Sequence, residues 1–154
     1  MVQNTVQSTY SRYGSAVGAA GAPATMSGYD SDTYYAQGTI PFGVAVSKGT
    51  GDRGCVKGGG TYVGISIRDV TLVHTTPDQY ELSDNVGVAI RGDWWVKVEA
   101  AVVARTAVKY NATTGQLGSA AGTTIAGAVW MTTQATVNGF AVVRLEGPAG
   151  DITT

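Results

Sequence analysis

The stretch Ile40-Pro41-Phe42-Gly43-Val44-Ala45-Val46-Ser47 alternates between larger apolar side chains and small ones. Successive side chains of a β-strand point to opposite faces, so Ile40, Phe42, Val44 and Val46 would share one face. This alternation over a short segment predicts a half-buried strand. The glycine-rich segment 48–54 that follows predicts a turn or loop.

Three further β-prone segments follow this stretch. Residues 62–73 form the longest one. Its apolar residues before Arg68-Asp69 would lie on one face of the strand, and Val70 and Leu72 after it on the other. A one-residue slip of this kind predicts a β-bulge or a sharp bend. Residues 86–90 and 94–100 also alternate, and Arg91-Gly92-Asp93 between them predicts a tight connection.

Three further strands are expected at residues 107–110, 128–131 and 140–145, and a short one begins at Tyr80. Asn138-Gly139 is a hairpin signal, because both residues tolerate a positive φ. No segment carries a capped apolar repeat with a period of 3.6 residues. The chain is therefore predicted to be all-β, a single β-barrel or jelly-roll-like sandwich of about eight short strands.

The N-terminal segment has a different composition from the rest of the chain. Residues 1–30 are rich in Gln, Asn, Ser, Thr, Ala and Gly and contain no alternating apolar run. Such a segment cannot bury itself and must be disordered or lie on a partner. We expect an extended arm over residues 1–33, an all-β domain over 34–147 and a loose tail over 148–154. The arm's candidate partner contacts are Tyr10, Arg12 and Tyr13, since Tyr and Arg are enriched in interface hot spots.

The composition excludes several classes of function. Charged residues make up 14% of the chain, the net charge is −1, and lysines and arginines occur singly. Binding to phosphates requires a clustered positive field, so we expect no direct nucleic-acid partner. Cys55 is the single cysteine, so no intramolecular disulfide is expected. Neither a signal peptide nor an apolar run of about 20 residues is present in the sequence, and no membrane association is expected.

Motifs with catalytic or ligand-binding associations lack their required context. Residues 49–54 match G-x-G-x-x-G, but the continuation does not predict the helix that a dinucleotide site needs. The Arg91-Gly92-Asp93 tripeptide is expected to serve as a turn, and His74 as a capping or exposed side chain. Asp30-Ser31-Asp32 begins like a calcium loop but lacks the glycine and glutamate that would complete it. We therefore predict no catalytic residue, no metal site and no cofactor.

Trp95 is the fourth candidate contact. Strand parity places it beside Lys97 and Glu99, on the face opposite Trp94 and Val96. A tryptophan on an otherwise polar face is typical of a contact surface, although a second sheet or the arm could also cover it.

Several segments together resemble the structural cement proteins of tailed-bacteriophage capsids. They include Ile40-Pro41-Phe42-Gly43-Val44-Ala45-Val46, Gly64-Ile65-Ser66-Ile67-Arg68-Asp69, Gly92-Asp93-Trp94-Trp95-Val96 and Asn138-Gly139-Phe140-Ala141-Val142-Val143-Arg144-Leu145. The resemblance also covers Ala128-Val129-Trp130-Met131 and the turn between residues 110 and 117, and it extends over roughly residues 35–147. The similarity is a pattern of glycines and β-branched residues.

The resemblance implies a small non-enzymatic protein of the virion that decorates the outside of the head. Its partners would be the major capsid protein and further copies of itself, as a homodimer or homotrimer. It would bridge capsid subunits, carry no cofactor, and be made in the host bacterial cytoplasm. The alternative is a carbohydrate-binding or adhesion β-sandwich of a virion surface or tail protein, in which Trp95 and nearby tyrosines would form a stacking platform.

Overall fold

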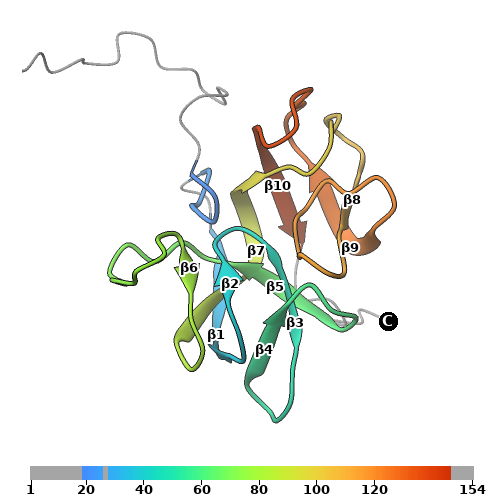
Figure 1. Ribbon diagram of the computed structural model, residues 1–154. Coiled ribbons are helices and arrows are strands. Elements are labelled where there is room, and N and C mark those ends of the chain that lie inside the picture. The colour runs from blue at the N-terminus through green and yellow to red at the C-terminus, as the bar shows by residue number, and fades with distance from the viewer. Residues whose placement is uncertain (1–18, 26–27, 147–154) are drawn as a thin grey trace, which may run out of the picture.

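The computed structural model describes residues 19–25 and 28–146, and these residues form ten β-strands (Figure 1). No helix occurs among them, and so none that could cross a membrane. The strands are β1 (Asp30–Ala36), β2 (Ile40–Pro41), β3 (Ala45–Lys48), β4 (Gly54–Lys57), β5 (Tyr62–Ser66), β6 (Gln79–Tyr80), β7 (Asn85–Lys97), β8 (Ala107–Tyr110), β9 (Thr123–Trp130) and β10 (Phe140–Glu146).

Strand β1 closes a β-barrel. It pairs with β7 in antiparallel orientation on one side and with β4 in parallel orientation on the other. The ring therefore runs β1-β4-β3-β5-β7 and returns to β1. Closure leaves the ring of five strands without a free edge, which is one way in which all-β folds avoid exposed edge strands. The prediction of an all-β fold is confirmed, and of the two architectures left open the barrel is the one observed.

Strand β7 extends beyond the barrel and carries a second layer. Its second half pairs with β10, and the sheet continues through β9 to β8 (Figure 1). Gly92 lies between the two halves with φ +108°, a conformation that L-residues rarely adopt. The backbone at Gly92 therefore changes direction at the point where β7 passes from the barrel to the second layer.

Two hydrophobic cores share β7. Val86 and Val88 in its first half pack in the barrel core with Ile40, Phe42 and Val46. A second core joins the barrel wall to the outer layer and contains Trp94, Val96, Leu117, Trp130 and Val143. The four larger residues of the segment 40–47 lie in the barrel core, as the alternation predicted. The expectation of a half-buried strand was wrong, because Ala45 and Ser47 on the opposite side are buried too.

Several expected strand boundaries were wrong. β6 ends at Tyr80 instead of beginning there, and β9 begins at Thr123 instead of Ala128. Arg91-Gly92-Asp93 lies inside the 13-residue strand β7, because Gly92 absorbs the bend without interrupting the pairing. Residues 62–73 do not form one long strand, since β5 ends at Ser66. Residues 40–47 are divided into β2 and β3, and Gly43 between them has φ +72°.

Other local predictions are confirmed. The Asn138-Gly139 prediction is confirmed as a turn, with Asn138 at φ 63°, but not as a tight hairpin, because residues 131–139 separate β9 from β10. Residues 49–53 form the loop of the hairpin between β3 and β4, with no helix after them. The Asn111 side chain accepts a hydrogen bond from the Thr113 amide at 2.8 Å and so closes a turn after β8.

Candidate binding surface

The outer face of the β7–β10 pair carries Trp95. Opposite it in the register lies Val142, and the neighbouring pairs on the same face are Asp93 with Arg144 and Lys97 with Phe140. Lys97 Nζ lies 6.0 Å from the centre of the Phe140 ring. Cross-strand pairs of this kind are the units that stabilise a sheet face. Val142 is fully buried, so the exposed part of this face combines two aromatic side chains, Trp95 and Phe140, with two cations, Lys97 and Arg144.

Asp93 and Arg144 form an ion pair with two hydrogen bonds on this face. Arg144 donates from Nε to Asp93 Oδ1 at 2.8 Å and from Nη2 to Oδ2 at 2.9 Å. The Asp93 side chain is 6% exposed and the Arg144 side chain 42% exposed. Two parallel charge-assisted hydrogen bonds fix the orientation of both groups. The ion pair therefore joins β7 to β10 just below Trp95.

The described N-terminal segment, residues 19–25, lies along the other edge of β7. Gly21 donates to the Trp95 carbonyl at 2.8 Å, and the Trp95 amide donates to Ala22 at 2.9 Å. The Ala24 amide donates to the Asp93 carbonyl at 2.8 Å. Residues 28–33, also expected in the arm, pair with β7 from Asp30 onward. The described part of the expected arm is therefore attached to the domain by main-chain hydrogen bonds.

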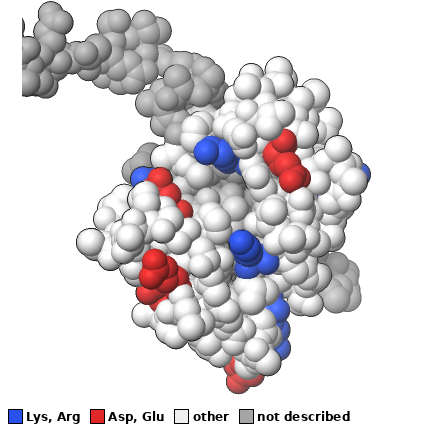
Figure 2. All heavy atoms as spheres, viewed as in Figure 1, with Lys and Arg blue, Asp and Glu red and all other residues white. Residues whose placement is uncertain are grey.

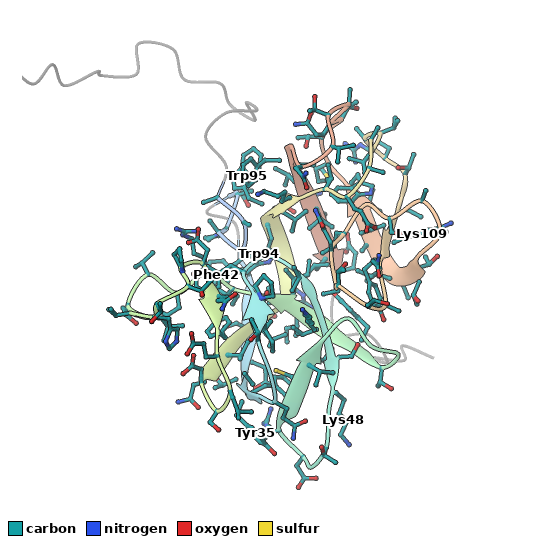
Figure 3. The ribbon with its side chains drawn as sticks, viewed as in Figure 1. Tyr35, Phe42, Lys48, Trp94, Trp95 and Lys109 are labelled. Carbon is teal, nitrogen blue, oxygen red and sulfur yellow. The ribbon has the colours of Figure 1, made fainter. Side chains whose placement is uncertain are left out.

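Trp95 lies beside residues 19–25, whereas Trp94 points into the middle of the molecule (Figure 3). Trp94 is 1% exposed, and Trp95 is half-buried. The prediction that Trp94 and Trp95 lie on opposite faces of the strand is thus confirmed. Tyr10, Arg12 and Tyr13 lie outside the described residues.

A cavity of about 420 Å³ opens next to this surface. The barrel contributes Phe42 and Arg68 to its lining, the second layer contributes Lys97 and Phe140, and Ala19 of the N-terminal segment completes the rim. Aromatic walls with a few polar groups are typical of binding sites. The sequence did not indicate Phe42 or Arg68 as contact residues, because they come from separate segments that only the fold brings together with Phe140.

Neighbouring carboxylates hold one titratable group of the described residues, His74, and burial shields two others, Cys55 and Tyr80. His74 lies between Asp84, at 2.6 Å from Nε2, and Glu81, at 3.5 Å from Nδ1. Burial raises the pKa of the Cys55 thiol to about 11 and that of the Tyr80 hydroxyl to about 12. A raised thiol pKa disfavours the reactive thiolate at neutral pH. Within residues 19–25 and 28–146, no three His, Cys, Asp or Glu side chains converge as a metal site would require.

These observations define a small β-barrel protein with an N-terminal extension and an aromatic surface suited to contact with a partner. The family described as "Structural cement protein (E217 gp24/Pam3 gp6)" matches residues 6–146, and the chain belongs to this family. The match includes Tyr10, Arg12 and Tyr13 as well as the whole barrel.

A solved structure described as "The capsid of Myoviridae Phage XM1" contains a chain of similar fold. The TM-score is 0.65 and the sequence identity 21%, and the alignment covers 94% of this chain and 96% of the other. At this identity the similarity establishes the fold. No curated protein sequence matches the chain.

Proposed function

We propose that this protein binds the outer surface of a bacteriophage head and stabilises it by bridging neighbouring major capsid subunits. Membership of the structural cement family, over residues 6–146, is the observation that carries the proposal. The fold shared with a chain of the phage XM1 capsid supports a location in the virion. The family implies a structural role, and we accordingly propose no catalytic activity.

The attachment of the N-terminal segment suits a bridging role. Residues 21–24 are hydrogen-bonded along β7, and β7 is the strand that the barrel and the second layer share. A force applied through the arm would therefore act directly on the most widely paired strand of the fold. An extended segment can also bind by pairing as an added strand with a sheet edge of its partner. Main-chain hydrogen bonds supply the affinity, so few specific side chains are required.

We propose that Tyr10, Arg12, Tyr13 and Trp95 contact the capsid. The first three belong to the arm, and Trp95 lies at the point where the described part of the arm meets the domain. An arm and a rigid domain that bind two neighbouring subunits would hold them together. Because contacts repeat over the shell, modest single-site affinities become strong retention.

Self-association is part of the proposal, as a homodimer or a homotrimer at symmetry positions of the shell. The protein would be made in the cytoplasm of the host and would join the outside of the assembled head. Analytical ultracentrifugation of the free protein measures its oligomeric state.

The binding proposal is tested with heads that lack this protein. The wild type, Trp95→Ala and Tyr10→Ala/Tyr13→Ala are added to the heads, and bound protein is quantified after sedimentation. Val103→Ala, an exposed position in the loop after β7, is the matched control. We expect saturable binding of the wild type and the control, and at least tenfold weaker binding of the tested variants. Lack of wild-type binding would refute the proposed function, and equal binding of all variants would refute only the assigned contacts.

The same Trp95→Ala variant separates the carbohydrate-binding alternative from the cement role. Binding of the wild type to a glycan array that is lost in the variant would favour that alternative. We expect no glycan-dependent signal from either protein.

A further inference from the structure

The loop between β5 and β6, residues 67–78, presents large aliphatic side chains to solvent. Val70 is 81% exposed and Val73 93%, and Leu82 in the following turn is 69% exposed. Figure 1 shows this green loop projecting from the barrel beside β6. Val70, Val73 and Leu82 are three of the seven most exposed large hydrophobic residues of the described chain. Clustered exposure of this kind is typical of an interaction surface.

Hydrogen bonds hold this aliphatic surface in place. His74 follows Val73 directly and is joined to Asp84 and Glu81, which flank Leu82 in the next turn. Asp69 accepts hydrogen bonds from the amide and hydroxyl of Thr71 at 2.9 and 2.6 Å. At the base of the loop, Tyr80 donates to the Ile67 carbonyl at 2.5 Å. The valines are therefore presented on an ordered loop, which reduces the entropy lost on binding.

The surroundings of the aliphatic surface are acidic. Four acidic residues lie in or next to the loop: Asp69, Asp78, Glu81 and Asp84. The loop contains one arginine, Arg68, which pairs with Asp78 at 3.0 Å. In Figure 2 the projecting part of this face is white, and red groups lie near its base, with a blue group beside the upper of them. An apolar centre with a negative border is complementary to an apolar depression bordered by Lys or Arg.

The base of the loop also lies where the arm meets the domain. The Arg68 amide donates to the Gly21 carbonyl at 2.9 Å. Ala19 and Ala20 line the same cavity as Arg68 and Asp78. The described start of the N-terminal segment therefore lies next to the base of the aliphatic loop. The occupant that we assign to this surface is accordingly the capsid subunit that the proposed function gives to the arm.

We propose that Val70, Val73 and Leu82 form a second attachment point, which inserts into an apolar depression bordered by basic side chains on the capsid subunit. This inference rests on the proposed function and adds a surface that neither the arm nor Trp95 supplies. Arm and loop would then bind the shell from one side of the domain. Removal of either would lower the affinity without abolishing it.

The test uses Val70→Ser/Val73→Ser, and Leu82→Ser as an independent variant. Val103→Ser/Val137→Ser is the matched control, because both of these valines are 58% exposed and lie outside the loop. Binding to heads that lack the protein is measured at 50 and 500 mM salt. We expect each loop variant to bind at least tenfold more weakly, the control to stay within twofold of the wild type, and salt to weaken the wild type.

The outcomes separate this inference from the proposed function. If the wild type binds heads and the loop variants bind equally well, the loop proposal is wrong and the cement role stands. If the wild type fails to bind, both are wrong. If the loop variants change the sedimentation coefficient of the free protein but not its binding to heads, the occupant is a second copy and the proposal is overturned. Unchanged unfolding midpoints show that the variants are folded.

Discussion

Asp93 on β7 and Arg144 on β10 lie directly opposite each other and are joined by two hydrogen bonds of 2.8 and 2.9 Å. The carboxylate is buried, whereas the guanidinium is partly exposed. Removal of the cation leaves a buried charge without this partner, which is costly in a low-dielectric environment. We predict that Arg144→Met lowers the free energy of unfolding by about 1–3 kcal/mol, the lower part of the range for broken buried pairs because Arg144 is partly solvated.

Chemical denaturation of Arg144→Met against Lys48→Met measures this effect. Lys48 is exposed at the end of β3, so its replacement should change stability by less than about 0.5 kcal/mol. Equal stability of the two variants would show that the ion pair does not hold β10 to β7.

Gly92 should be intolerant of a side chain. Its φ of +108° is unfavourable for L-residues, and an added Cβ would lie 2.5 Å from the Cβ of Tyr29. We predict that Gly92→Ala destabilises the fold by about 2 kcal/mol or more. Gly87 lies in the same strand, and a Cβ there would meet Ile67 at an ordinary 3.5 Å. Gly87→Ala should therefore stay within about 1 kcal/mol of the wild type, and a comparable loss in both variants would contradict the role given to Gly92.

The same glycine explains why part of the fold could not be predicted from the sequence. Arg91-Gly92-Asp93 has the composition of a turn, and only the pairing of β10 across it shows that the strand continues. Local patterns did predict the parity of Trp94 and Trp95 and the strand at residues 107–110, because both depend on neighbouring residues alone. Barrel closure depends on the parallel pairing of Tyr35 with Gly54, a non-local contact with no pattern in either segment.

The contact surfaces likewise include one that local sequence patterns predict and one that depends on non-local contacts. Trp95 could be predicted as a contact residue because the alternation of the neighbouring residues alone shows on which face of the strand it lies. The aliphatic loop was missed because Val70 and Leu72 alternate like strand residues, whereas Arg68 bonds to Gly21 and the chain leaves the sheet after Ser66. The relevant interaction comes from a segment more than forty positions away.

Asp84 should contribute to the acid sensitivity of the fold. The amide of Glu81 and then His74 hydrogen-bond to its carboxylate and lower its pKa from the ordinary 3.8. A lowered pKa in the folded state gives stability that is present above about pH 4 and is lost as the pH falls through the folded pKa. We predict that Asp84→Asn is less stable than the wild type at pH 7, and that the difference shrinks towards pH 2.

Denaturant titrations at pH 7, 4, 3 and 2 measure this prediction. The residual slope of the variant would include Asp32 and Asp69, whose carboxyl pKa values are also lowered by hydrogen bonds. A stability difference that stays constant from pH 7 to pH 2 would contradict the assigned role of Asp84.

Truncations should separate the arm from the segment that is part of the domain. Residues 21–24 make main-chain hydrogen bonds with Trp95, Asp93 and Arg68. Each such bond contributes about 1 kcal/mol, so removal of residues 1–25 should destabilise the protein by about 2–4 kcal/mol. Removal of residues 1–18 leaves these bonds intact and should preserve the unfolding midpoint while weakening binding to heads. Equal thermal stability of both truncations would show that residues 21–24 do not support the barrel.

The cement role itself is tested most directly by the resistance of filled heads to rupture. DNA-filled heads that lack this protein are heated with increasing amounts of the wild type, and DNA release is followed with an intercalating dye. The proposed bridging predicts that the release temperature rises with bound protein, reaches a plateau at saturation, and rises less with the 1–18 truncation. A release temperature that stays unchanged while the protein saturates the heads would contradict the central claim.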